Sequence, residues 1–542
     1  MTGGQRRPSC DMTIEDSAFL RHELDSIDPL QLTSSERQRP KQPQENRGPN
    51  HGNGCNEDHR KSDWNKTDVW LEARLFLELA GVSSLMNLGF ISSPLLTASY
   101  VGRSFSPVYL SAFTLANLTG NLCTFSMMAG LFSASDTLSP QAFGRGDFAE
   151  VGRIAIRGFA VASALLLPIN VVLFCYLEPI MIALGQDAEA SVYASQWYKI
   201  FVFNLPFSIL FNCLWKFLTA QHIMKPLIFV SILCTCVILP LSLEICIQTM
   251  GFVGSAVGYV IFQASQAMAL LFYMYWKQPH DARTWPGLSR EIVAGALEWN
   301  QMKEFLHLGI GGVVAQCEWV FWEAIGLIVG RLGVVALSVH TIPNQTIMAF
   351  CMVPFSFGIA LAIRMGISLP LSVRRTQVIV LAILLFSTIL FGLVTIAVYV
   401  YRDTIVGLFT TSDSVKELAD VIWLKVSLFN LNIAIFGILV GIATGLGKQW
   451  SLGVINFVFL WLFGLPMIYY TAIVRDEGLD AAWYWMNIPY LCMNATLIVM
   501  FVFTDWHQIQ EQILLAGEKK NIDANDDRQE GSAVTNERTS LL

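Results

Sequence analysis

The sequence has few charged residues, and this shortage excludes most soluble folds. Asp, Glu, Lys and Arg make up 14% of its 542 residues, whereas a soluble domain carries about 25%. Hydrophobic residues make up 54%, which is typical of an integral membrane protein. No block of basic residues is present, so we expect no nucleic-acid partner. The partner that this composition predicts is the lipid bilayer.

Metal and disulfide motifs are also lacking. The eleven cysteines are scattered, and the only close pair is Cys234 and Cys236. Without a CxxC motif or a Cys/His cluster, the sequence predicts neither a zinc site nor a disulfide framework. We expect the cysteines to pack as small apolar residues, and we expect no cofactor.

A nucleotide-binding loop is lacking as well. The nearest candidate runs from Gly441 to Gln449. A phosphate-binding loop would need glycine at the position of Ile442, and Ser or Thr at the position of Gln449. No polar region is long enough for a soluble nucleotide-binding domain. Work across the membrane would therefore draw on an ion gradient or on substrate moving downhill.

The two ends of the chain are polar. Residues 1–68 have no hydrophobic periodicity and do not begin with a secretory signal, which predicts a disordered cytosolic tail. Residues 504–542 are expected to form a second cytosolic tail. It ends in Leu541-Leu542 after Glu537, which resembles a sorting signal that adaptors read for vacuoles or lysosomes. The alternative is a featureless tail on a protein of the plasma membrane.

Twelve apolar runs lie between these tails. Each approaches or exceeds the ~20 residues that a helix needs to cross a bilayer, and runs this long exclude the short alternating strands of a barrel. Lys and Arg are concentrated in the even-numbered connections, which predicts that these connections and both termini are cytosolic. The runs cover about 74–98, 106–132, 155–180, 197–220, 226–247, 252–276, 304–330, 335–362, 376–401, 419–445, 451–473 and 480–503.

The two halves of the chain are similar to each other. Val101-Gly102-Arg103 is repeated as Val329-Gly330-Arg331, 228 residues later, and Leu239-Pro240 is repeated as Leu465-Pro466, 226 residues later. Six helices are an even number, so both halves have the same orientation in the membrane.

We therefore expect an all-α integral membrane protein with twelve transmembrane helices in two pseudo-symmetric six-helix lobes. The N-lobe would cover residues 69–276 and the C-lobe residues 304–503, with a cytosolic linker at 277–303. The sequence has no feature that requires an oligomer, and we expect a monomer.

Two carboxylates lie within the seventh run, at Glu318 and Glu323. A charge at membrane depth is costly, so an acid there indicates a site for a proton, a metal ion or an organic cation. The alternative is that both acids pair with neighbouring helices. Trp319 and Trp322 flank them, and an acid beside an aromatic ring suits an organic cation. Packing of the tryptophans against lipid or other helices is equally open.

Other polar residues lie at helix depth or at helix ends. His340 in the eighth run titrates near neutral pH and is a candidate for a proton path, although a neutral, hydrogen-bonded ring is the alternative. For Asp136 we expect hydrogen bonds to the backbone, and for Lys216 a position at the membrane interface. Asn121 and Gln141 either bond between helices or line a cavity.

Four segments together resemble one family. Residues 133–144 resemble the ALDTLCGQAYG signature of the multidrug and toxic compound extrusion (MATE) family, and residues 317–323 resemble its CLEWWWYE stretch. Residues 352–360 and the pair 445–449 with 464–466 resemble later motifs, in family order. The resemblance covers about residues 72–503 and is nearest to eukaryotic members.

This resemblance implies a secondary antiporter rather than an enzyme. Protons, or sodium ions, would enter while an organic cation, drug or metabolite leaves. The family's site residues carry over to Glu318, Glu323, Asn121 and Gln141. The sequence departs from animal members at Asn432 and Gln345, where an acid is expected. Glu318 and Glu323 would therefore carry more of the coupling. A flippase for lipid-linked sugars, with the same architecture, is the alternative function.

Overall fold

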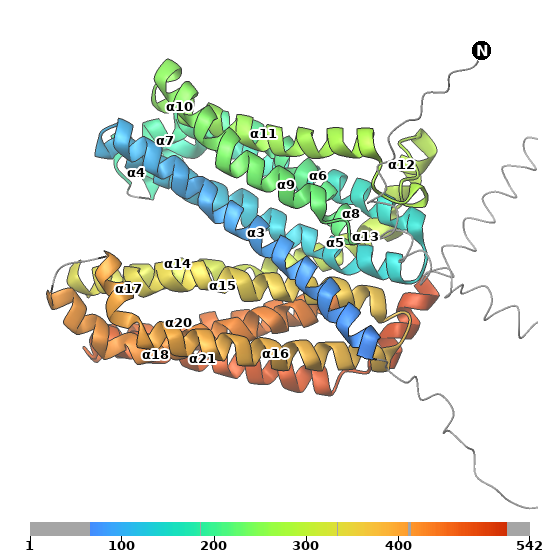
Figure 1. The fold of residues 1–542 in the computed structure, drawn as a ribbon. Coiled ribbons are helices and arrows are strands. Elements are labelled where there is room, and N and C mark those ends of the chain that lie inside the picture. The colour runs from blue at the N-terminus through green and yellow to red at the C-terminus, as the bar shows by residue number, and fades with distance from the viewer. Residues whose placement is uncertain (1–65, 185, 333, 410–412, 517–542) are drawn as a thin grey trace, which may run out of the picture. The chain divides into compact units, whose positions relative to one another are not determined.

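The computed structural model describes residues 66–184, 186–332, 334–409 and 413–516. The predicted N-terminal tail up to residue 65 and the Leu541-Leu542 signal lie outside this part. The side chains of Glu323 and Gln345 lie outside it too, although their backbones are helical. Every regular element in the described part is helical, as the all-α prediction requires (Figure 1).

The first half of the chain contains the first six predicted spans. Its helices are α3 (Lys66–Ser104), α4 (Pro107–Gly120), η1 (Asn121–Phe125), α5 (Ser126–Gly144), α6 (Phe148–Ala183), α7 (Ala188–Phe201), η2 (Val202–Asn204), α8 (Leu205–Thr219), α9 (Lys225–Leu233), η3 (Cys234–Ile238), α10 (Leu239–Met250) and α11 (Phe252–Lys277). The short η4 (Ala282–Thr284) and α12 (Arg290–Ala296) connect it to the second half.

The second half contains the other six spans. Its helices are α13 (Trp299–Ala315), α14 (Cys317–Gly330), α15 (Val334–Ser368), α16 (Val373–Val400), α17 (Arg402–Phe409), α18 (Asp413–Gly445), α19 (Gln449–Asn456), η5 (Phe457–Gly464), α20 (Leu465–Tyr469), η6 (Tyr470–Val474) and α21 (Gly478–Val502). Residues 506–516 form a further helix.

Eleven stretches in the described part are long and apolar enough to cross a membrane. The continuous helix through α4, η1 and α5 is the twelfth span of the predicted set. Its polar residues include Asn121, Asp136 and Gln141. The twelve-span architecture is thus confirmed.

The two halves share a backbone irregularity that follows from the repeated Leu-Pro pair. A π-helical segment, η3, directly precedes Leu239-Pro240, and another, η5, directly precedes Leu465-Pro466. Proline has no N–H to donate to the preceding turn and its ring crowds that turn. A wider turn relieves the crowding, and such insertions are a recognised cause of helix bends. The sequence repeat therefore has a structural counterpart in both halves.

The seventh span is not the continuous helix that the sequence predicts, because it breaks at Gln316. α13 ends at Ala315 and α14 begins at Cys317. A broken helix leaves carbonyl groups without partners, which membrane proteins satisfy from neighbouring side chains. Here Asn456 Nδ2 donates to the Ala315 carbonyl at 3.0 Å, and Trp461 Nε1 donates to the Cys317 carbonyl at 3.1 Å. The break is therefore built into the fold immediately before Glu318.

The two parts of this span pack in different places. α13 packs against α5 of the first half and against α19, whereas α14 packs against α15, α20 and η5. Close approach explains the glycines of α13: a Cβ added to Gly312 would lie 2.2 Å from the Gly130 carbonyl oxygen of α5. α13 is thus joined tightly to the first half, while α14 belongs to the second.

The halves are held together at the end of the bundle where residues 278–298 lie, which we call the linker end. Thr137 Oγ1 donates to the Thr444 carbonyl at 2.6 Å, and Gln449 Nε2 donates to Thr137 Oγ1 at 2.7 Å. Nearer the middle of the bundle, Asn87 Nδ2 of α3 donates to Ser356 Oγ of α15 at 2.9 Å. In the described part of the chain, no hydrogen bond or ion pair joins the halves at the opposite end, near α4 and α17 (Figure 1).

Candidate functional site

Glu318 lies inside the second half, in the first turn of α14. Its side chain is 4% exposed. Tyr490 of α21 donates a hydrogen bond from its hydroxyl to Glu318 Oε1 at 2.8 Å. Among the described residues, no lysine, arginine or histidine pairs with this carboxyl group. Glu318 is therefore a buried acid whose described partner is a neutral hydroxyl.

The hydrogen bond to Glu318 has a fixed direction. Trp322 Nε1, one turn further along α14, donates to the Tyr490 hydroxyl oxygen at 2.9 Å. An indole N–H can only donate, so Tyr490 accepts there, and this leaves its own proton free to be donated to the Glu318 carboxylate. The sequence predicted that Trp322 lies beside Glu318. The structure adds that Tyr490 links the two side chains.

Aromatic rings enclose this arrangement and extend it to His340. The Phe429 ring of α18 lies 4.9 Å from Tyr490 and 5.2 Å from Trp322, measured between ring centroids. It also lies 6.0 Å from Trp483, whose ring is 5.3 Å from that of His340. His340 therefore belongs to the same aromatic cluster as Glu318. The imidazole is buried, and its Nδ1 atom has no described hydrogen-bond partner.

A cluster of asparagine side chains lies beside Tyr490, on α18 and α21. Asn432 Nδ2 of α18 donates to Asn487 Oδ1 of α21 at 3.0 Å. Asn494 Nδ2 donates to the Asn432 carbonyl at 2.9 Å. Asn432 is the position at which the family resemblance implied an acid. This chain has a neutral, hydrogen-bonded pair there, so Glu318 keeps an uncharged neighbourhood on that side.

The remaining predicted residues are spread over the bundle. Trp319 is half-buried, with its ring 5.8 Å from that of Phe355. Asn121 opens the π-helical segment η1 in the first half and is half-buried. No described contact joins Asn121 to Glu318. The side chain of Glu323 lies outside the described residues. The roles assigned to these residues stay predictions.

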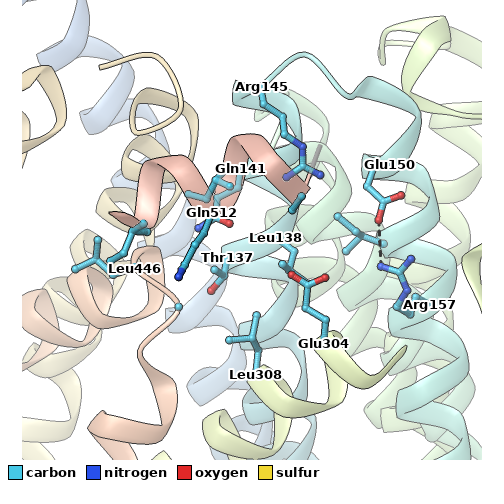
Figure 2. A pocket seen from close by; sticks show the side chains of 15 residues that line it. Thr137, Leu138, Gln141, Arg145, Glu150, Arg157, Glu304, Leu308, Leu446 and Gln512 are labelled. Atoms are coloured by element: carbon cyan, nitrogen blue, oxygen red, sulfur yellow. Dashed lines mark hydrogen bonds and ion pairs between the residues drawn. The ribbon is translucent and has the colours of Figure 1, made fainter. Parts of the chain in front are cut away.

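Gln141 lies at the linker end, between the two halves. Its Nε2 donates to the Gly445 carbonyl at 3.2 Å. It also lines a cavity of about 170 Å³ together with Thr137, Arg145, Glu304 and Gln512. Figure 2 shows these side chains around the cavity: Thr137, Gln141 and Arg145 come from α5 and its C-terminal end, Glu304 comes from α13, and Gln512 comes from the C-terminal helix. In this structure Gln141 is thus a contact between the halves.

Asp136 and Lys216 correct two expectations. Lys216 of α8 does not reach toward a membrane interface, because its Nζ pairs with the Asp136 carboxylate of α5 at 2.8 Å. Both side chains are largely buried. Pairing with Asp136 compensates the charge of the buried lysine, which would be costly to bury alone. Asp136 therefore has a basic partner, unlike Glu318.

Sequence reasoning missed Tyr490. It lies 172 residues after Glu318, in a twelfth span whose many aromatic residues look alike in the sequence. Its preceding residue, Pro489, is the only local signal, and proline inside a membrane helix is too common to mark a site. Tyr490 reaches Glu318 only because α21 packs against α18 within the second half.

A twelve-span helical bundle with two repeated halves, and with a buried acid that has no described basic partner in the second half, is typical of a membrane transporter. The family model MatE matches residues 83–243 and 313–470. These two matches fall in the two halves and cover more than half of the chain. The chain therefore belongs to the MatE family, as its sequence motifs suggested.

Curated relatives agree with this assignment. The chain is 26% identical over 448 residues to multidrug and toxin extrusion protein 2 of Mus musculus, covering 82% of this chain and 77% of the relative. It is 28% identical over 453 residues to the protein of the same name from Oryctolagus cuniculus, covering 82% and 73%.

Solved structures share the fold. The eukaryotic MATE transporter AtDTX14 superposes with a TM-score of 0.74 at 21% identity, over 82% of this chain and 99% of that one. The Vibrio cholerae MATE transporter VcmN in the bent form gives 0.68 at 14% identity, over 83% and 99%.

Proposed function

We propose that this transporter is an antiporter that exchanges protons for an organic cation at Glu318. The observation that carries the proposal is the buried carboxyl group of Glu318, which has a neutral donor, Tyr490, and no basic partner among the described residues. A buried carboxylate without a cation is costly. A proton or a cation removes that cost, and the two then compete for one group.

The surroundings of Glu318 favour an organic cation over an alkali ion. A sodium site needs several oxygen ligands around the ion, whereas the groups described around this acid are mainly aromatic. Trp322, Phe429 and Tyr490 pack together beside Glu318, and an aromatic face attracts a cation through its π-electrons. The names of the mouse and rabbit relatives, multidrug and toxin extrusion proteins, are consistent with a broad range of substrates.

The way in which the halves are joined supports alternating access. Most of the described hydrogen bonds between them lie at the linker end, which we place in the cytosol from the distribution of Lys and Arg. In this state, Glu318 would exchange with the side opposite the cytosol. Separation of the halves at the linker end would then admit substrate from the cytosol. We further propose that this membrane is either the plasma membrane or that of a vacuole or lysosome.

The test is uptake of a fluorescent organic cation into proteoliposomes under an imposed pH gradient without sodium. Glu318→Gln keeps the size and hydrogen-bonding capacity of the side chain but removes its titration. We expect proton-driven uptake to fall at least about 100-fold, because one side of the exchange is lost. Glu244→Gln is the control and should retain uptake, because Glu244 is an exposed acid in the middle of α10 that bonds Gln248.

Full uptake by Glu318→Gln would contradict the proposal. Uptake that requires sodium and ignores the pH gradient would replace the proton with sodium as the coupling ion. Flipping of a labelled lipid-linked sugar, with no cation uptake, would support the alternative function.

A further inference from the structure

A charged cluster joins the two halves at the linker end. Glu72 of α3 pairs with Arg364 of α15 and with Arg375 of α16, the latter at 2.5 Å. From the first half, His222 in the connection between α8 and α9 places its Nε2 at 2.8 Å from Arg364 Nη1. Arg364 of the second half is thus held by a carboxylate and an imidazole that both belong to the first half.

The hydrogen bond between His222 and Arg364 specifies the protonation state of the histidine. A guanidinium group has only donors, so Nε2 of His222 must accept. The imidazole in this contact is therefore neutral and carries its proton on Nδ1. A second proton on Nε2 would remove the acceptor and place two positive charges next to each other.

The loop that carries His222 is fixed by hydrogen bonds to the linker, whose η4 and α12 pack against α6 of the first half. His222 has a φ of 59°, in the left-handed region, and its neighbour Gln221 accepts hydrogen bonds from Thr284 Oγ1 at 3.0 Å and from the Asp281 N–H at 3.3 Å. The backbone of His222 is therefore held with the first half, on the opposite side of the contact from Arg364. Repulsion between a protonated His222 and Arg364 would therefore push the two halves apart.

The charged groups around His222 do not compensate for a second positive charge. Arg364 from α15 faces the ring directly, and the carboxylate of Glu72 is already shared between Arg364 and Arg375. On the first half, Lys225 begins α9 three residues later, and Asp281 pairs with Arg283 at 2.8 Å. Enclosure of the ring, and then the charge of Arg364, hold the pKa of His222 well below its ordinary value.

We propose that His222 makes the contact between the halves at the linker end sensitive to pH on that side. Neutral His222 holds Arg364 and favours the joined state. Once the halves separate, the imidazole is hydrated and takes up a proton near its ordinary pKa of about 6.5. Because the joined state binds this proton less well, acid on the linker side favours separation. Cytosolic acid would thereby favour the state that loads substrate and releases protons.

This inference rests on the alternating access in the proposed function, but not on Glu318. The test is therefore a distance measurement that needs no substrate. A keto amino acid at Leu288, in the linker, and at Leu371, between α15 and α16, can be coupled to nitroxides without replacing any of the eleven cysteines. Both side chains are exposed. Double electron–electron resonance in nanodiscs then reports the separation at about pH 7.5 and about pH 5.5.

Three variants distinguish the possible causes of a pH-dependent change in this distance. His222→Asn keeps a carbonyl acceptor and tolerates the left-handed backbone, but does not titrate. Glu72→Gln removes the carboxylate that holds both arginines. Glu318→Gln controls for protonation inside the second half, since nanodiscs expose both faces to the same pH.

In the wild-type protein and in Glu318→Gln, acid should raise the population with the longer distance several-fold. His222→Asn should show no such rise, and Glu72→Gln should show the longer distance at both pH values. An equal acid response in His222→Asn, no response in the wild type, or loss of the response in Glu318→Gln would each overturn the inference. Failure of cation uptake in Glu318→Gln tests only the proposed function.

Discussion

The buried acids of the two halves differ in their partners. In the first half, Asp136 pairs with Lys216 at 2.8 Å and Glu150 with Arg157 at 3.2 Å. In the second half, Glu318 has only Tyr490 as a described polar partner. At the repeat offset of 228 residues, the position equivalent to Glu318 in the first half is Phe90. The halves thus share their backbone arrangement, but Glu318 has no acidic counterpart in the first half.

This difference suggests a division of roles. Acids that pair with bases already have a compensating charge. The Asp136–Lys216 pair joins α5 to α8, whereas Glu150 and Arg157 both lie on α6. An acid without a base must bind something else, and what it binds can change during a cycle. We therefore propose that the first half serves as a scaffold and that the second half, through Glu318, provides the exchange site. The predictions below test this division.

The largest effect on stability is expected from Lys216→Met. Removal of the lysine leaves the Asp136 carboxylate buried without a partner, which costs roughly 3–5 kcal/mol. Glu318→Gln, by contrast, should leave stability nearly unchanged, because Glu318 has no base to lose. Thermal unfolding in detergent, followed by the fluorescence of a thiol-reactive dye, measures both variants.

The double variant Asp136→Asn with Lys216→Met is the control for that experiment. It removes both charges, so most of the lost stability should return. Equal losses in Lys216→Met and Glu318→Gln would show that the two halves do not differ in this respect.

Tyr490→Phe should have the next largest effect, and it should act on transport. The variant removes the hydroxyl that donates to Glu318 and accepts from Trp322. A hydrogen bond to a charged group is worth about 1.5–3 kcal/mol, so we expect cation uptake to fall by about tenfold or more. Initial rates in proteoliposomes measure this effect. An unchanged rate would remove Tyr490 from the exchange site.

Tyr198→Phe in the first half should have the smallest effect. Its hydroxyl donates to Asn170 Oδ1 at 3.0 Å, but Thr124 Oγ1 donates to the same oxygen at 3.0 Å. Loss of one of two donors should cost about 1 kcal/mol of stability and leave uptake within about twofold of the wild type. A loss of uptake equal to that of Tyr490→Phe would place a transport role in the first half as well.

The sequence was sufficient for the architecture because its signals are local or repeated. Long apolar runs predicted the spans, and the repeated Leu-Pro pairs predicted two equivalent halves, which the π-helical segments η3 and η5 confirm. Glu318 was found because an acid inside an apolar run is conspicuous in any membrane sequence.

The sequence was not sufficient for the contacts of these residues. The break at Gln316 depends on Asn456 and Trp461, which reach the freed carbonyls from a helix more than a hundred residues away. Tyr490 and the Asp136–Lys216 pair are likewise set by tertiary packing. No spacing rule predicts which tyrosine will face a buried acid. The contact depends on how each helix is rotated about its axis when the helices pack, and sequence periodicity predicts only that the helices form.

The central claim is that Glu318 exchanges a proton for a cation, and proton release on binding tests it most directly. Purified protein in weakly buffered detergent solution, with a pH-sensitive dye, is mixed with a saturating organic cation. We predict that the wild-type protein releases protons on binding and that Glu318→Gln, whose stability is retained, releases none. Equal release by both proteins would contradict this account.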